Sequence, residues 1–116
     1  MADQVAWFEV TGKDGSKLQS FYGDLFGWQI NADNPMNYGM VQGENGGIGG
    51  GVGQSQDGST RVTFYVAVDD PQAALDRAAQ LGGRTVVPVT EIPDMVTFAQ
   101  FADPEGNVVG IIKNRG

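Results

Sequence analysis

The sequence contains no cysteine and no histidine among its 116 residues. Without cysteine the chain forms neither disulfides nor zinc–thiolate sites, and it has no thiolate nucleophile. Without histidine it lacks imidazole metal ligands and the usual general base of catalysis.

Basic residues are also scarce, with seven Lys and Arg against 14 Asp and Glu, and the net charge is -7. Because the few basic residues are scattered, the chain would repel phosphate backbones, and nucleic acid is not an expected partner. The N-terminus has no secretory signal pattern, and no apolar run approaches membrane-spanning length. We expect a cytoplasmic protein without a membrane partner.

The composition is that of a globular protein, with 41% hydrophobic and 18% charged residues. A chain of this length is large enough to bury a core and too short for two unrelated domains. We therefore expect one domain spanning residues 1–116.

The first half predicts the element order βαβββ. Residues 4–10 are aromatic and β-branched, which is typical of a strand, and residues 28–30, 38–42 and 48–52 are three further strand candidates. Residues 16–26 have the spacing of a helix with one buried stripe, ending at Gly27. The stripe comprises Leu18, Phe21, Tyr22, Leu25 and Phe26.

The second half repeats this order. Residues 61–68 predict a strand, and Asp70 followed by Pro71 is typical of a helix start. Residues 84–89, 96–102 and 108–113 then predict three more strands. The sequence of residues 45–50 also corresponds to that of residues 105–110. Together these observations predict a duplicated unit, with modules at about 1–55 and 60–116.

Several short motifs in this order carry a family resemblance: Trp7-Phe8-Glu9-Val10, Phe26-Gly27-Trp28 and Asp103-Pro104-Glu105-Gly106-Asn107. With the doubled βαβββ pattern, the chain resembles the vicinal-oxygen-chelate superfamily of glyoxalases, bleomycin-resistance proteins and extradiol dioxygenases. The resemblance implies an α+β fold in which two tandem modules form a curved sheet around a U-shaped cavity, with the helices outside. Function then depends on the residues inside.

The resemblance also implies four positions at which family enzymes hold a divalent metal through His and Glu. In this sequence the first falls on Trp7, with Val5 as the alternative register, and the second on Thr63. The last falls on Gly110, and the internal repeat carries it back to Gly50. None of these residues supplies the required donor, so we predict no protein-held metal and no cofactor.

The residues expected to face the cavity follow from strand alternation, which places Trp7 with Glu9 and Thr63 with Tyr65. Aromatic walls and a few polar groups are typical of ligand pockets. Glu9 could instead pair structurally with Arg61 or Gln100, and the aromatic residues could be simple core. The predicted ligand-binding residues are Trp7, Glu9, Tyr38, Gly50, Thr63, Tyr65, Gln100 and Gly110.

Glycine dominates residues 46–53, but the spacing fits no nucleotide-binding loop and no helical pattern follows. Two interpretations stay open. The strand is either kept bare so that a ligand or another backbone can approach closely, or it is a flexible edge.

These observations favour a metal-free protein that binds a small, partly aromatic or cationic organic molecule, and we expect a homodimer. The alternative is a metal-independent isomerase, cyclase or hydrolase-like enzyme that uses Glu9 as acid or base, with Tyr65 or Thr63 orienting the substrate. A metal-dependent lyase or dioxygenase is the least favoured reading.

Overall fold

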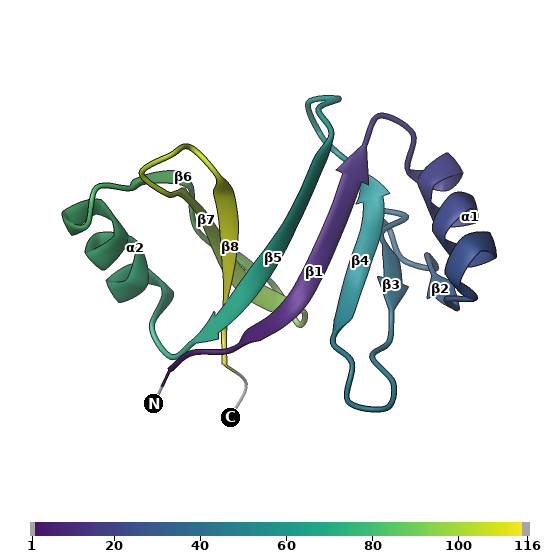
Figure 1. The fold of residues 1–116 in the computed structure, drawn as a ribbon, viewed down its shortest axis with the longest axis horizontal. Helices are drawn as coiled ribbons and strands as arrows, with labels where there is room; N and C mark the ends of the chain where they lie inside the picture. The colour runs from purple at the N-terminus through teal and green to yellow at the C-terminus, as the bar shows by residue number, and fades with distance from the viewer. Residues whose placement is uncertain (1, 115–116) are drawn as a thin grey trace. The chain divides into compact units, whose positions relative to one another are not determined.

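The computed structural model describes residues 2–114. They form an α+β fold in which the βαβββ order occurs twice (Figure 1), as the sequence predicts. Residues 7–63 make one compact unit, here the N-terminal unit, and residues 64–114 with residues 2–6 make the C-terminal unit. No helix in the described chain has the length and apolar character needed to span a bilayer. The elements are β1 (Val5–Gly12), α1 (Gly15–Phe26), β2 (Ile30–Asn31), β3 (Gly39–Val41), β4 (Gly49–Gln54), β5 (Arg61–Val68), α2 (Pro71–Gln80), β6 (Arg84–Ile92), β7 (Val96–Ala102) and β8 (Val108–Lys113).

In the N-terminal unit the strand order is β2-β3-β4-β1, with β4 parallel to β1 and antiparallel to β3. Helix α1 begins after Asp14, whose carboxylate accepts a hydrogen bond from the Lys17 N–H at 3.1 Å. It ends at Gly27, which has a left-handed φ of 72° and whose N–H donates to the Gly23 carbonyl at 2.9 Å. Both ends thus follow ordinary capping chemistry.

The predicted buried stripe of α1 is wrong for three of its five residues. Leu18 and Tyr22 are half-buried, whereas Phe21, Leu25 and Phe26 are 57%, 59% and 57% exposed. Leu18 and Tyr22 lie on the side of the helix that faces the sheet. Phe21 and Leu25 lie on the neighbouring side, which points away from the sheet. The spacing therefore predicted the helix correctly and overestimated the width of its buried face.

In the C-terminal unit the strand order is β5-β8-β7-β6, with β5 and β8 parallel. Its core comprises Val68, Leu75, Ala99 and Ile111, so one face of the sheet packs against α2. The side chain of Asp70 caps this helix through the Ala73 N–H at 3.1 Å. Strands β5, β7 and β8 have the predicted bounds, while β6 continues past residue 89 to Ile92 with two register shifts.

Candidate functional site

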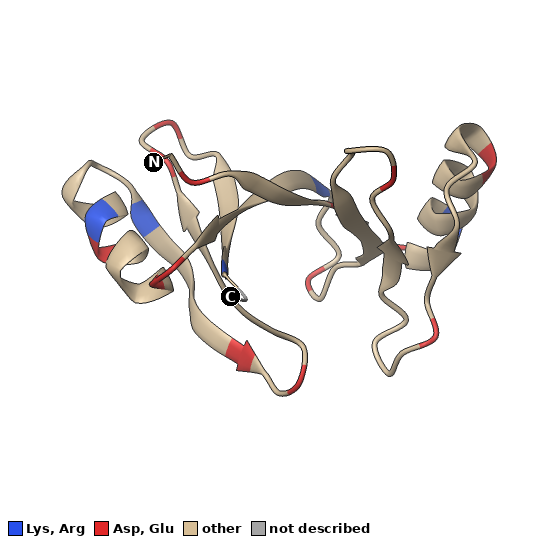
Figure 2. Cartoon of the chain, turned by 90° about the horizontal axis from the view of Figure 1, so that it is seen from below, with Lys and Arg blue, Asp and Glu red and all other residues tan. Residues whose placement is uncertain are grey.

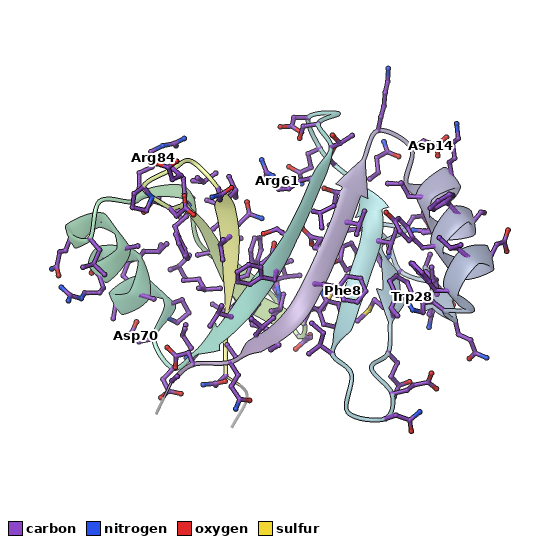
Figure 3. The ribbon with its side chains drawn as sticks, viewed as in Figure 1. Phe8, Asp14, Trp28, Arg61, Asp70 and Arg84 are labelled. Atoms are coloured by element: carbon purple, nitrogen blue, oxygen red, sulfur yellow. The ribbon has the colours of Figure 1, made fainter. Side chains whose placement is uncertain are left out.

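In each unit, one face of the strands is covered by that unit's helix, and we call the opposite face the helix-free face. In the N-terminal unit, Phe8 marks the covered side, because its ring centroid lies 5.2 Å from that of Trp28 beside the end of α1 (Figure 3). Trp28 in turn stacks on Tyr22 of α1, with ring centroids 5.8 Å apart. Since side chains alternate along a strand, Trp7 and Glu9 project from the helix-free face.

Trp7, Tyr38 and Glu9 form a hydrogen-bonded chain on this face. The Trp7 indole N–H donates to the Tyr38 hydroxyl oxygen at 3.1 Å. The Tyr38 O–H donates in turn to Glu9 Oε2 at 2.8 Å. All three side chains are half-buried. The structure thus brings together three predicted site residues, two from β1 and one from the loop that precedes β3.

The side chain of Asn34 fixes the segment that carries Tyr38. Its Oδ1 accepts from the Tyr38 N–H at 2.9 Å and its Nδ2 donates to the Tyr38 carbonyl at 2.7 Å. From α1, Gln19 Nε2 donates to the carbonyls of Asn37 and Val52, each at 2.9 Å. Neither Asn34 nor Gln19 is among the site residues predicted from the sequence. Both side chains form hydrogen bonds with backbone groups, and the sequence alone does not show which backbone groups lie close to them after folding.

The glycine-rich strand β4 makes room for the protein's own aromatic rings. A Cβ at Gly49 would lie 3.1 Å from the Trp7 ring, and one at Gly51 would collide with the Tyr38 hydroxyl. On the opposite face, a Cβ at Gly50 would collide with the Phe8 ring. The interpretation as a flexible edge is therefore corrected, because the strand lies between β3 and β1. The close approach of another backbone is found at Gly49, where a Cβ would lie 2.9 Å from the Val41 carbonyl oxygen.

Gly50 is thus misplaced in the predicted site, because it pairs with Phe8 on the helix-covered face. Its neighbour Gly51, which pairs with Glu9, is the glycine on the helix-free face. The predicted alignment of β4 is therefore shifted by one residue. Because side chains alternate between the two faces of a strand, a shift of one residue assigns the position to the wrong face.

The turns before β4 and β8 explain this error. The Gly47 N–H donates to the Glu44 carbonyl at 2.8 Å, and the Gly106 N–H donates to the Asp103 carbonyl at 2.9 Å. The two turns differ in conformation, because Asn45 and Gly46 both have a positive φ in the first, whereas only Gly106 does in the second. The strand pairings, and not the turns, make Gly51 the counterpart of Gly110. The sequence comparison had aligned Gly46 with Gly106, since both are flanked by similar residues.

The C-terminal unit has a second tyrosine-centred pair. Gln100 Nε2 donates to the Tyr65 hydroxyl oxygen at 2.8 Å, and the two residues are 7% and 5% exposed. Tyr65 lies over Gly110, with which it pairs across β5 and β8, and Gln100 pairs with Gly110 from β7. These three residues share the helix-free face of this unit, because their neighbours Val66, Ala99 and Ile111 face α2. Thr63 lies two residues before Tyr65 on β5 and is also buried.

The two registers settle which residues are equivalent in the two modules. Glu9 pairs with Gly51 as Tyr65 pairs with Gly110, so Trp7 is the counterpart of Thr63. The positions that the resemblance assigns to metal ligands are then Trp7, Gly51, Thr63 and Gly110, and none carries a His or Glu. Among residues 2–114, moreover, no group of three or more carboxylates lies close enough to hold a metal ion.

Asp103 and Asn107 close the turn that precedes β8. The Asn107 N–H and side-chain amide both donate to the Asp103 carboxylate at 2.9 Å. These hydrogen bonds, led by the Asn107 side chain, lower the pKa of Asp103 below its usual value. Figure 2 shows acidic residues distributed over loops and helices of both units, with few basic residues among them.

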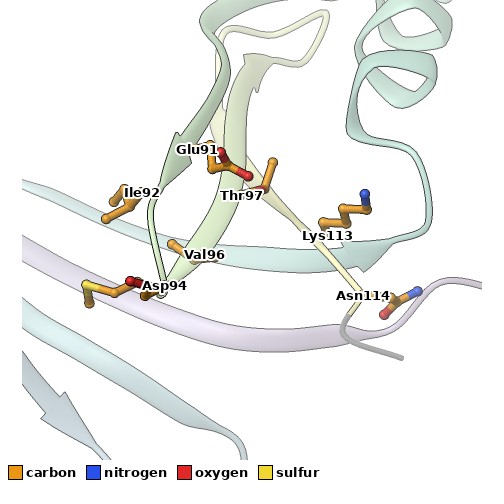
Figure 4. Close-up of a pocket in the computed structure, with 8 residues that line it drawn as sticks. Glu91, Ile92, Asp94, Val96, Thr97, Lys113 and Asn114 are labelled. Carbon is orange, nitrogen blue, oxygen red and sulfur yellow. The ribbon is translucent and has the colours of Figure 1, made fainter.

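Two surface cavities lie outside the predicted residues. One, of about 320 Å³, is in the C-terminal unit at the β6–β7 hairpin (Figure 4), and Glu91, Asp94, Thr97 and Lys113 contribute its polar lining. The other, of about 340 Å³, lies beside α1 and includes Asp24 and Trp28. Neither cavity is lined by any of the eight residues predicted to bind a ligand.

Comparison with known proteins agrees with this architecture. Residues 7–112 match the family of the glyoxalase-like domain. The chain belongs to that family.

CFP32 of Mycobacterium bovis, which carries a glyoxylase name, is 30% identical over 115 residues. The match covers 90% of this chain and 43% of that protein, so the chain spans less than half of this relative's length. A glyoxylase-like domain-containing protein of Didymella fabae is 26% identical, with 97% of this chain and 95% of that one covered.

Solved structures share the fold at low sequence identity. A glyoxalase/bleomycin resistance protein/dioxygenase superfamily member from Vibrio splendidus has a TM-score of 0.64 at 18% identity, covering 97% of this chain and 100% of the other. Methylmalonyl-CoA epimerase from Mycobacterium tuberculosis has a TM-score of 0.69 at 12% identity, covering 97% and 88%. The glyoxalase-like family thus places the chain in the superfamily that its sequence motifs resemble.

Proposed function

We propose that this protein binds a small organic ligand at the helix-free face of its N-terminal unit and holds no metal through its own side chains. The chain of hydrogen bonds from Trp7 through Tyr38 to Glu9 carries this proposal. It combines two aromatic surfaces with a carboxylate, which is the mixture of apolar contact and orienting polar groups typical of ligand sites. The U-shaped cavity that the family resemblance implies remains a prediction.

Two further observations support a ligand site. Tyr38 is held by Asn34 on both its N–H and its carbonyl, so its hydroxyl is positioned before any ligand arrives. The fold is also shared with proteins named for small-molecule chemistry, among them methylmalonyl-CoA epimerase. The epimerase likeness extends to the fold alone, because the identity is 12%.

Mass spectrometry of small molecules that co-purify with the protein tests the proposal. We expect one compound in near-stoichiometric amount with the wild-type protein and much less with Trp7→Ala. Glu44→Gln, an exposed change in the turn before β4, should retain it. If neither co-purification nor screening of a broad metabolite panel finds a compound whose binding depends on Trp7, the proposal is contradicted.

A second candidate is a metal-independent isomerase, cyclase or hydrolase-like enzyme that uses Glu9 as acid or base. The 2.8 Å hydrogen bond from the Tyr38 O–H to Glu9 favours it, because proton transfer requires contact at this distance. Incubation with a metabolite extract should then consume a compound in a Glu9-dependent manner. An extract left unchanged by the wild-type protein would speak for binding alone.

A further inference from the structure

The cavity at the β6–β7 hairpin of the C-terminal unit has charged residues of both signs in its lining. Its volume is about 320 Å³, the size of a small-molecule site. Glu91 and Asp94 contribute carboxylates, and Lys113 contributes an ammonium group (Figure 4). Thr97 adds a hydroxyl. All four residues lie in the C-terminal unit, away from the Trp7 site on β1.

Strand pairing places Glu91, Thr97 and Lys113 in one row across three strands. Glu91 pairs with Thr97 across β6 and β7. The register of β7 with β8, in which Phe98 pairs with Ile112, puts Thr97 beside Lys113. Directly opposed residues of antiparallel strands have Cβ atoms about 5 Å apart, so the Cβ atoms of Glu91 and Lys113 are about 10 Å apart with Thr97 between them.

This row lies next to the core of the unit, on the same face of the strands. Thr97 shares its face with Ala99, and Lys113 shares its face with Ile111, because side chains two residues apart on a strand point the same way. Ala99 and Ile111 are buried in the core against α2, whereas Glu91 and Lys113 are exposed. The charged row is therefore the part of this face that the helix leaves open to solvent.

The opposite charges at the two ends of the row determine which ligand fits. Among residues 2–114, neither the Glu91 carboxylate nor the Lys113 ammonium group forms an ion pair. A ligand with a single charge is attracted by one of these groups and repelled by the other. A zwitterion is attracted by both, and the Thr97 hydroxyl can hydrogen-bond to either of its charged ends. Asp94 lies outside the row, at the turn of the hairpin (Figure 4).

We propose that this cavity binds a short amino acid in its zwitterionic form, between Glu91 and Lys113. The ammonium group of the ligand contacts the Glu91 carboxylate, and the carboxylate of the ligand contacts the Lys113 ammonium group. The inference goes beyond the ligand site proposed above and is independent of it, because the two sites share no residue. Both charged side chains are exposed, so each contact strengthens binding about fivefold at most.

The test compares γ-aminobutyrate with butylamine and butyrate, which carry only its positive and only its negative charge. Binding is followed by NMR through the backbone amide signal of Thr97. The zwitterion should bind roughly threefold to fivefold more tightly than either of the other two compounds. Raising the salt concentration should reduce this preference. If butylamine or butyrate binds as tightly as γ-aminobutyrate, or if none of the three shifts the Thr97 signal, the proposal is overturned.

Variants then identify the groups responsible. Glu91→Gln and Lys113→Gln should each weaken γ-aminobutyrate binding roughly threefold. The matched controls Glu105→Gln and Lys13→Gln remove the same charges at exposed positions outside the cavity and should leave binding unchanged. Equal weakening by Glu91→Gln and Glu105→Gln would show that net charge alone attracts the ligand, which overturns the proposal.

One further variant separates this inference from the proposed function. Trp7→Ala removes an aromatic side chain of the N-terminal site and should leave γ-aminobutyrate binding unchanged. If Trp7→Ala abolishes that binding while Glu91→Gln does not affect it, the zwitterion occupies the N-terminal site, and the inference fails while the proposed function stands. Circular dichroism checks that each variant is folded.

Discussion

The hydroxyl of Tyr38 lies over Gly51 of β4, in the space that the side chain of any other residue would occupy. The glycine at this position therefore leaves room for the Tyr38 ring. Gly51 pairs with Glu9 across the parallel β1–β4 ladder, so the same contact brings the phenol within hydrogen-bonding distance of the carboxylate. The candidate site therefore depends on the absence of a side chain on β4.

Gly51→Ala should destabilise the protein by about 1–3 kcal/mol, because the new methyl group must displace the Tyr38 ring. Gly23→Ala is the matched control: its methyl group would meet its nearest neighbour at 3.4 Å, an ordinary contact, and alanine favours a helix. Urea unfolding of both variants measures the difference. An equal free energy of unfolding for Gly51→Ala and the wild type would show that Tyr38 does not occupy this space.

The sequence predicted the element order and the family, because both depend on local patterns that repeat. The start of α2 after Asp70, the end of α1 at Gly27 and the bounds of β5 follow from capping and alternation, which neighbouring residues determine. Strand alternation also placed Trp7 and Glu9 on one face correctly. The sequence also showed that the positions which the resemblance assigns to metal ligands carry neither His nor Glu.

Other features depend on contacts between distant residues and were not predictable. Whether Gly50 or Gly51 shares a face with Glu9 is decided by the pairing of β4 with β1, which the amino-acid pattern of a glycine run does not encode. Likewise, Gln19 reaches two carbonyls that come near it only after folding. The exposure of Phe21 and Leu25 reflects how much of α1 the small N-terminal sheet covers.

The purified protein should contain no stoichiometric zinc, nickel, manganese or iron. The reason is chemical: the chain has no His or Cys, and Trp7, Gly51, Thr63 and Gly110 provide none of the donors that such ions prefer. Elemental analysis after dialysis provides the measurement. One tightly bound transition metal per chain would contradict this expectation.

We expect a homodimer at micromolar concentration. The row of exposed apolar side chains on α1, with Phe21 and Leu25 each more than half exposed, is one candidate contact, because clustered exposed apolar groups often mark interfaces. Light scattering gives the mass in solution. A mass of one chain, unchanged on concentration, would rule the dimer out.

Asp103→Asn should reduce stability at neutral pH and matter less in acid. The folded protein lowers the pKa of Asp103 from 3.8, chiefly through the Asn107 side chain. The resulting stabilisation is fully present above the unfolded pKa of 3.8 and is lost as the pH falls through the lowered folded value. Denaturant unfolding of wild type and variant over this range checks the sign. A difference that grows on acidification would show that the carboxylate is not stabilised in its charged form.

Tryptophan fluorescence tests most directly whether the helix-free face of the N-terminal unit binds the ligand. The chain has two tryptophans, Trp7 in the candidate site and Trp28 packed beside α1 on the covered face. Adding the co-purified ligand should quench or shift the emission of the Trp28→Phe variant, in which Trp7 remains. The Trp7→Phe variant should show a much smaller change and weaker binding. A ligand-induced change that persists in Trp7→Phe and disappears in Trp28→Phe would place the ligand on the other face of the sheet.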